Sequence, residues 1–323
     1  MASGSSGTRV RVLSDNDYAG DPDGLLQLAH QALSTSAELV AVIGSHLPRN
    51  PSFDPRCDSA DRAADEASTV LDLAGAEAVP VLAGSNVPLA ARNTPIDTPA
   101  VRYIIDAAMA SDDRPLFTCF GGGLTELASA WLLEPRIAGR FTAIWIGGAE
   151  HPGLADPPPG AGTAEFNASI DPIAAQVVLN DSDLDVWQVP RDAYRQVLVG
   201  MADLEDNLAG QGPLGDHLLS RIESGEDFVR SHGLTPGEVM VLGDSPLVSL
   251  STLQTTFEPS PASSRWVQRP APLIASDGSY AGEDPRGRTV RVFTHIDTAL
   301  IVRDLFAKVS RLARRASAGE SGR

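Results

Sequence analysis

Short apolar runs alternate with segments of helical periodicity along most of the chain. We interpret the apolar runs as strands, at residues 10–13, 39–44, 79–84, 116–120, 141–146, 184–189 and 289–293. We interpret the segments with apolar residues every three or four positions as helices, at residues 25–33, 59–74, 100–110, 124–133, 173–179 and 298–312. Because the strands are apolar over almost their whole length, both faces of the sheet must be covered. The pattern predicts an α/β domain, Rossmann-like, with a mainly parallel open sheet and helices on both faces.

The remaining segments outline a single domain with two loose ends. We expect residues 1–8 to form a flexible N-terminal segment, residues 9–310 to form the α/β domain, and the basic, Ser- and Gly-rich residues 311–323 to form a disordered tail. Residues 200–235 are polar and helical in pattern, which is typical of a cap or of a contact between subunits. Residues 239–242 are apolar and predict either a short buried strand or the start of a helix.

Four aspartates follow the first strand within nine residues, Asp15, Asp17, Asp21 and Asp23, just before the first helix. Ligands of open α/β sheets bind at this carboxyl edge. Like charges packed so tightly repel each other unless a cation neutralises them, and a hard divalent cation prefers oxygen ligands. The alternative is a solvated turn in which Asp23 caps the helix. An EF-hand is excluded, because Leu26 stands where the bidentate glutamate of its loop belongs.

Composition narrows the classes of partner. The chain has 323 residues and a formal net charge of -17, which disfavours nucleic acid and anionic membranes and favours a neutral or cationic small molecule. Cys57 and Cys119 match no metal-binding spacing, and such low cysteine content favours a reduced, cytoplasmic setting. The sequence predicts neither a signal peptide nor a membrane-spanning helix.

Three later segments carry candidate chemistry. The glycine turn that begins at Gly121 can offer a backbone carbonyl to a metal, although a tight strand-to-helix turn explains it equally. Glu165 and Asn167 flank a phenylalanine and have the chemistry of hydroxyl recognition, with capping of a helix start as the alternative. If these two alternate sides of the chain with Phe166, the ring is buried on the other side. Asp244 precedes a proline and is either a helix cap or a distant metal ligand.

Two common hydrolase classes are disfavoured. The histidines are scattered, without the H-E-x-x-H spacing of a zinc site, and the chain has no G-x-S-x-G nucleophile motif.

In their order along the chain, these segments resemble the inosine-uridine-type, calcium-dependent nucleoside hydrolase family, from Val10 to about Phe306. The family's D-x-D-P-G-x-D-D cluster is similar to residues 15–24, with a proline inserted between the last two acids. Its A-E-F-N-x-x-x-D-P segment is matched by residues 164–172. Further similar segments are residues 42–46, 122–126, 146–148, 243–247 and 287–297.

The resemblance implies one domain that binds one Ca²⁺ ion at the carboxyl edge of the sheet. Asp17, Asp23 and Asp244 would be carboxylate ligands, together with a backbone carbonyl near Gly121. Asp15 would orient the cluster or bind a sugar hydroxyl.

The resemblance also implies hydrolysis of the N-glycosidic bond of a ribonucleoside or related N-riboside. Asp21 would be the general base that takes the proton of a calcium-activated water. Glu165 and Asn167 would bind ribose hydroxyls, and His46 would lie on the substrate side of the site. Family members are often homodimers or homotetramers.

Two departures from the family pattern leave alternatives open. Pro22 makes either Asp21 or Asp23 the base. Gly243 replaces a histidine that protonates the departing base in purine-cleaving members, so His46 or His151 is a candidate acid. The alternatives to a ribonucleoside hydrolase are a non-catalytic, calcium-dependent nucleoside-binding protein and a hydrolase of a modified nucleoside.

Overall fold

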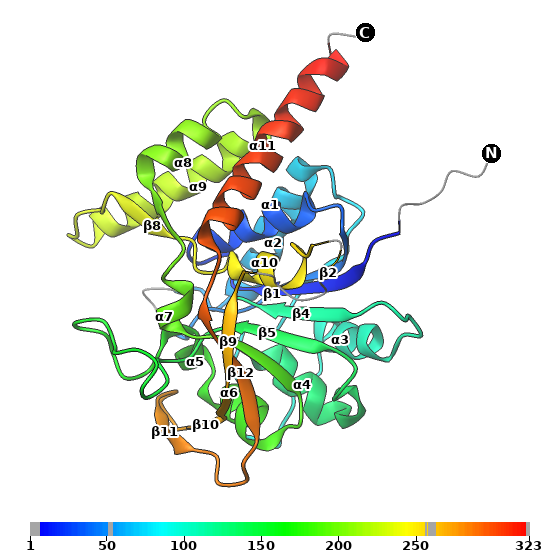
Figure 1. Ribbon diagram of the computed structural model, residues 1–323, viewed down its shortest axis with the longest axis vertical. Helices are drawn as coiled ribbons and strands as arrows, with labels where there is room; N and C mark the ends of the chain where they lie inside the picture. Colours follow the sequence, from blue (N-terminus) through cyan, green and yellow to red (C-terminus); the bar gives the residue numbers. More distant parts are fainter. Residues whose placement is uncertain (1–6, 51–53, 256, 258–262, 321–323) are drawn as a thin grey trace.

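The computed structural model in Figure 1 describes residues 7–50, 54–255, 257 and 263–320. Its centre is an eight-stranded sheet with the order β3-β2-β1-β4-β5-β6-β12-β9. The strands are β1 (Val10–Asn16), β2 (Ala37–Gly44), β3 (Val81–Ala83), β4 (Leu116–Phe120), β5 (Thr142–Ile146), β6 (Asp185–Val189), β9 (Arg265–Pro270) and β12 (Thr289–His295). Neighbouring strands are parallel except at the edge, where β9 runs antiparallel to β12. The predicted, mainly parallel α/β sheet is confirmed.

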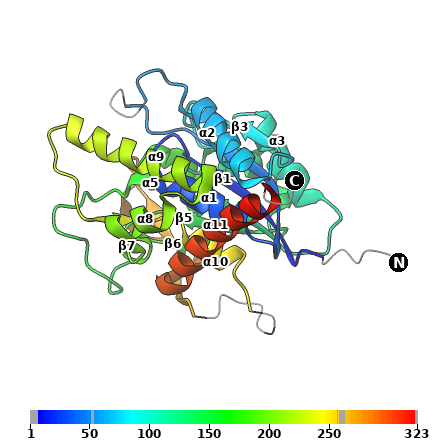
Figure 2. The same cartoon turned by 90° about the horizontal axis from the view of Figure 1, so that it is seen from above.

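Helices cover both faces of this sheet. One side carries α1 (Asp23–Ala32), α2 (Ser59–Ala74), α8 (Met201–Leu208), α9 (Gly212–Ser231), α10 (Pro246–Ser251) and α11 (Thr298–Glu320). The other side carries α3 (Pro99–Met109), α4 (Thr125–Leu133) and α6 (Pro172–Gln176). Figure 2 shows α1, α2, α9 and α11 from above, lying over the sheet. None of the described helices is both long enough and apolar enough to cross a bilayer.

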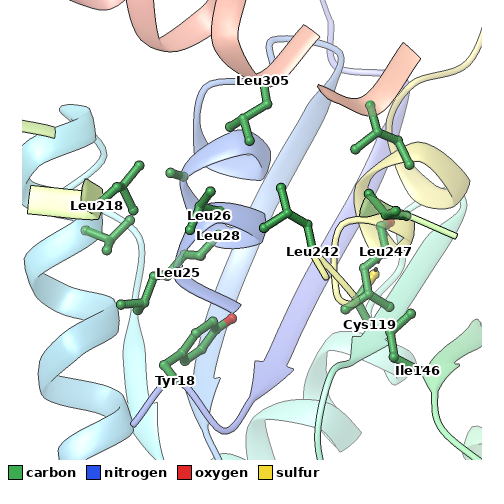
Figure 3. Packing of buried hydrophobic residues seen from close by; sticks show 14 of the residues in the cluster. Tyr18, Leu25, Leu26, Leu28, Cys119, Ile146, Leu218, Leu242, Leu247 and Leu305 are labelled. Atoms are coloured by element: carbon green, nitrogen blue, oxygen red, sulfur yellow. Dashed lines mark hydrogen bonds between the residues drawn. The ribbon is translucent and has the colours of Figure 1, made fainter. Parts of the chain in front are cut away.

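Alternation along the strands divides the core into two layers. Val10 and Val12 of β1 pack on the α1 side, whereas Leu13 packs on the α4 side. Figure 3 shows the leucines of α1 packed near Leu218 of α9 and Leu305 of α11. Both sheet faces are therefore apolar, which is why the sequence shows continuous apolar runs.

Several short elements complete the chain. They are α5 (Phe166–Ile170), α7 (Arg191–Tyr194), the 3-10 turn Pro135–Ile137, the π-helical turn Val177–Asp181, and the antiparallel pairs β7 (Leu198–Gly200) with β8 (Val239–Val241) and β10 (Pro272–Ile274) with β11 (Tyr280–Glu283). The apolar run at 239–242 thus includes a strand, but Val239 is 59% exposed, so the expected burial of this strand is wrong.

The prediction of a disordered tail is wrong for residues 311–320. Helix α11 continues to Glu320 and runs out beyond the body of the molecule in Figure 1. Alanine and arginine are strong helix formers, so the segment extends a helix that is already nucleated against the core. Residues 1–6 and 321–323, parts of the two expected loose ends, lie outside the described residues.

The order of the strands reverses direction at β1. From β1 the chain moves outward through β2 and β3, and it then returns to the other side of β1 for β4, β5 and β6. The crevice at the carboxyl ends of β1 and β4 is the topological switch point at which such sheets bind ligands. The aspartate cluster begins at the end of β1, and Gly121 directly follows β4.

Candidate active site

A large cavity of about 1000 Å³ lies at this switch point. Seven of the nine predicted site residues line it: Asp17, Asp21, Asp23, Gly121, Glu165, Asn167 and Asp244. We call these seven residues the acidic floor. Asp244 is more than two hundred positions from the other aspartates, so the fold brings together the separate segments that the sequence singled out.

Asn16, the last residue of β1, holds two parts of the acidic floor together. Its Nδ2 donates to Oδ2 of Asp244 at 2.9 Å, and its Oδ1 accepts the backbone N–H of Asp17 at 2.8 Å. The amide is fully buried against the Gly121 turn, where a Cβ at position 121 would lie 2.3 Å from Asn16 Nδ2. Only glycine leaves room for this side chain.

Asp23 and Asp244 are not helix caps. Pro22 precedes α1 and Ser245 precedes α10, and neither helix start has a side-chain cap. Oδ2 of Asp23 instead accepts the backbone N–H of Asp244 at 3.1 Å. The capping interpretation is therefore wrong for both aspartates. The Asp23 carboxyl accepts the backbone N–H of Asp244, and the Asp244 carboxyl accepts the side-chain amide of Asn16.

The floor carboxyls are electrostatically crowded. Burial, with added repulsion from Asp21, raises the pKa of Asp17 to about 7. Burial also raises the pKa of Asp23 and of Asp244 well above the ordinary value, and neighbouring carboxyls push both further in the same direction. A cation among these groups would remove the repulsion.

Glu165 is both a helix cap and part of the cavity. Its Oε2 accepts the N–H groups of Gly148 at 2.8 Å and Ala168 at 3.1 Å at the start of α5. Its Oε1 accepts the Tyr194 hydroxyl at 2.9 Å. The capping alternative is thus confirmed for Glu165, but the carboxyl still faces the cavity.

Asn167 is oriented by two backbone carbonyls. Its Nδ2 donates to the oxygens of Gly121 at 2.8 Å and Ile146 at 2.9 Å, which links the ends of β4 and β5. Phe166 between the two polar residues is 43% exposed and lines the cavity, so the expectation of a buried ring is wrong. The reason is that helix α5 begins at Phe166 and ends the strand-like alternation.

Two predicted site residues lie outside the cavity lining. Asp15 is fully buried, its carboxyl oxygens have no hydrogen-bond partner in the described part of the chain, and burial and Glu126 raise its pKa. His46 is buried between the Thr125 hydroxyl at 3.0 Å and the Leu47 carbonyl at 2.9 Å. Direct contact of either side chain with substrate is not supported by these positions.

His151 is also held away from the cavity. Its Nε2 lies 2.9 Å from Oε1 of Gln188, and its ring contacts Tyr280. The structure therefore places neither candidate histidine where it could protonate a departing base.

Tyr194 is a cavity residue that sequence reasoning missed. Its ring fills the space beside Gly243, where a Cβ would lie 3.2 Å from Tyr194 Cδ2 and 3.3 Å from Asp23 Oδ2. No motif marks Tyr194 in the sequence. Asn16, by contrast, could have been found as a buried amide among the four aspartates.

The donors of the acidic floor suit a hard cation. In the described part of the chain, no three or more His, Cys, Asp or Glu side chains are arranged as an assembled metal site. The floor nevertheless offers only oxygen donors of the kind that Ca²⁺ and Mg²⁺ prefer: the carboxylates of Asp17, Asp23 and Asp244 and the carbonyl of Gly121. The raised pKa values of these buried carboxyls are what such a site shows without its positive charge.

Comparison with known proteins gives consistent matches. The 35% identical inosine-uridine preferring nucleoside hydrolase of Leishmania major aligns over 164 residues, 43% of this chain and 50% of that protein. The enzyme of the same name from Crithidia fasciculata is 34% identical over 147 residues, 38% of this chain and 44% of that protein. The chain thus spans about half the length of the curated relatives it matches.

Solved structures share the fold over nearly the whole chain. A plant nucleoside hydrolase and the purine-preferring ribonucleoside hydrolase of Gardnerella vaginalis each superpose with a TM-score of 0.69, at 19% and 18% identity. Both comparisons cover 94% of this chain and 99% of the other. The family model for inosine-uridine preferring nucleoside hydrolases matches residues 13–248, which include all the residues of the acidic floor, and the chain belongs to that family.

Proposed function

We propose that this protein hydrolyses the N-glycosidic bond of a ribonucleoside or related N-riboside and releases the base and ribose. The observation that carries the proposal is the convergence of Asp17, Asp23 and Asp244 with Glu165 and Asn167 in one cavity at the switch point. Carboxylates around a sugar stabilise the positive charge that develops at the anomeric carbon.

The floor would hold a calcium ion. Asp17, Asp23, Asp244 and the Gly121 carbonyl are the donors, and a carbonyl oxygen that accepts the Asn167 amide retains a second lone pair. When bound, the ion supplies charge for two sugar hydroxyls and lowers the pKa of a water.

We assign the general base to Asp17, although the sequence pattern favoured Asp21. Asp21 is exposed at the cavity mouth, and its Oδ1 is 3.4 Å from the N–H of Asp23. Asp17 is only 9% exposed and lines the cavity among the proposed calcium ligands, so it can take the proton of a water held at the ion. Asp21 is then placed to contact a sugar hydroxyl from the mouth.

The remaining floor groups orient the sugar. Two backbone N–H groups and Tyr194 fix the Glu165 carboxylate, so it accepts a hydrogen bond from a sugar hydroxyl without reorganising. Asn167 uses its Nδ2 on backbone carbonyls, which leaves its Oδ1 as the acceptor for a hydroxyl. Water attacks the anomeric carbon, Asp17 takes its proton, and the C–N bond breaks with the electron pair leaving on the base, which takes a proton from solvent.

The test combines activity with removal of the metal. The protein is incubated with adenosine, inosine, guanosine, uridine and cytidine, with Ca²⁺ or after treatment with a chelator, and reducing sugar is measured. We expect release of ribose from at least one nucleoside, loss of release in chelator and recovery with Ca²⁺. Asp206→Asn, on the exposed side of α8, is the control and should retain full activity. Binding of nucleosides without any release of ribose would refute hydrolysis.

A further inference from the structure

One side of the cavity is lined by apolar side chains that are only partly buried. They are Phe166, Met201, Phe228, Val229, Val239 and Met240, and we call them the apolar wall. Phe166, Phe228 and Val239 are 43%, 47% and 59% exposed. Large exposed apolar groups gathered around one cavity are typical of a binding site.

The charged side chains in this part of the cavity are already paired. Nε of Arg62 lies 2.8 Å from Asp58, Arg221 lies 3.1 Å from Glu66, and Glu226 lies 2.8 Å from Arg230. Their polar groups are therefore engaged by protein, and the wall recognises a ligand mainly through apolar contact. Arg195 also lines the cavity and is exposed at its mouth, where its positive charge would favour a negatively charged ligand.

The apolar wall directly adjoins the acidic floor. Helix α9 passes so close to the aspartate loop that a Cβ at Gly225 would lie 3.6 Å from the Pro22 ring. Phe166 stands between Glu165 and Asn167 in the chain and belongs to the wall. When the floor holds the sugar, the base attached to that sugar therefore lies next to the apolar wall rather than next to polar side chains.

We infer that the preferred substrates are N-ribosides whose leaving group is an aromatic base enlarged by an apolar substituent. This inference rests on the proposed function. The volume of about 1000 Å³ is at the upper end for small-molecule sites and exceeds the needs of a simple nucleoside. Two methionines in the wall suit a variable apolar group, because their unbranched side chains adapt in shape.

The experiment compares three ribosides that differ only at one position of the base: adenosine, N6-benzyladenosine, and N6-succinyladenosine, which carries carboxylates there. Both kcat/KM and the equilibrium Kd are measured for each. We expect kcat/KM or affinity to be about tenfold or more higher for N6-benzyladenosine than for adenosine. A gain of this size is what an apolar group bound in an apolar pocket supplies. Phe228→Ala and Met240→Ala should each remove most of this preference and leave adenosine within about twofold.

Leu300→Ala is the matched control, because Leu300 is a 42% exposed leucine on α11 that is not among the residues lining the cavity. Equal kcat/KM for adenosine and N6-benzyladenosine would overturn the inference and leave the proposed hydrolysis intact. Preference for N6-succinyladenosine would overturn it in favour of recognition by Arg195. Tighter binding of N6-benzyladenosine without cleavage would support the wall and refute hydrolysis. A dimer that Phe228→Ala converts to monomer would show that the wall is a subunit contact and would overturn the inference.

Discussion

The acidic floor and the apolar wall face the same cavity, but they are held in different ways. Asn16, at the end of β1, donates a buried hydrogen bond to the Asp244 carboxyl, and the Asp23 carboxyl accepts the Asp244 backbone N–H, so the floor is tied to β1 and to the segment before α10. The wall is carried by α5, α8, α9 and β8, and its members are partly exposed. The difference teaches that the groups proposed for bond cleavage are fixed by the sheet, whereas the groups proposed to select the leaving group can vary with little effect on the fold.

The largest effect should come from removing the base on the floor. Asp17→Asn is expected to lower kcat by about 10²–10⁴-fold, because a neutral amide cannot take the proton of the attacking water. Asp21→Asn should act mainly on KM. Steady-state kinetics of both variants at saturating Ca²⁺ decide the assignment: a loss of kcat in Asp17→Asn that added Ca²⁺ does not reverse supports Asp17 as the base, and a loss of kcat confined to Asp21→Asn would return the base to Asp21.

Calcium should stabilise the floor in a pH-dependent manner. The folded-state pKa of Asp17 is about 7, above the value of about 4 in an unfolded chain. Without metal, the folded state binds the proton more tightly, so this contribution to stability is complete below about pH 4 and is lost as the pH rises to about 7.

Thermal melting in chelator should therefore show a falling Tm between pH 5 and 8. Added Ca²⁺ should raise Tm more at pH 8 than at pH 5, with about 2.7 kcal/mol gained at a hundredfold excess over Kd. A Ca²⁺ effect of the same size at both pH values would contradict binding by these carboxyls. Mg²⁺ at the same concentration tests the choice of ion.

A smaller effect is expected from the link between the two floor segments. Asn16→Ala removes the donor to Asp244 and should lower the free energy of unfolding by about 1–3 kcal/mol, measured by urea titration. Asn207→Ala is the matched control, because that amide donates at 2.8 Å to the Asp203 carbonyl one turn earlier in α8, in a solvent-exposed bond. Equal losses for the two variants would show that the buried link does not hold the floor.

The smallest effect is expected from the wall. Val239→Ala should change the free energy of unfolding by less than about 0.5 kcal/mol, since its side chain is 59% exposed. Leu26→Ala, at a fully buried core position on α1, should lower it by about 2–5 kcal/mol in the same urea titration. If Val239→Ala lowered the free energy of unfolding as much as Leu26→Ala does, the wall would not be a region that can vary with little effect on the fold.

The sequence was informative where local pattern decides structure. The strands of the parallel sheet and the convergence of Asp17, Asp23 and Asp244 follow from apolar runs and from the rule that ligands bind at the carboxyl edge. The edge strand β9 was missed because Arg265 to Pro270 lacks an apolar run, being exposed at the sheet edge. A strand of this kind is set by pairing with β12, which single-sequence patterns do not contain.

Side-chain direction was the least predictable property. Asp15 and His46 have the same chemistry and nearly the same sequence position as true cavity residues, but β-strand alternation and packing turn them into the core. Tyr194 enters the cavity from α7 only because the distant Gly243 leaves space for its ring. Such complementarity between remote positions depends on the assembled fold.

The contact between Gly243 and Tyr194 also limits how this protein could be redesigned. A histidine introduced alone at position 243 would crowd the Tyr194 ring and the Asp23 carboxyl, because its Cβ would lie within 3.3 Å of both. An engineer who wants an acid at that point must therefore exchange two residues together, with a smaller side chain at position 194. Natural drift between the two arrangements would face the same paired step, which makes the glycine and the tyrosine a joint signature to search for in other sequences.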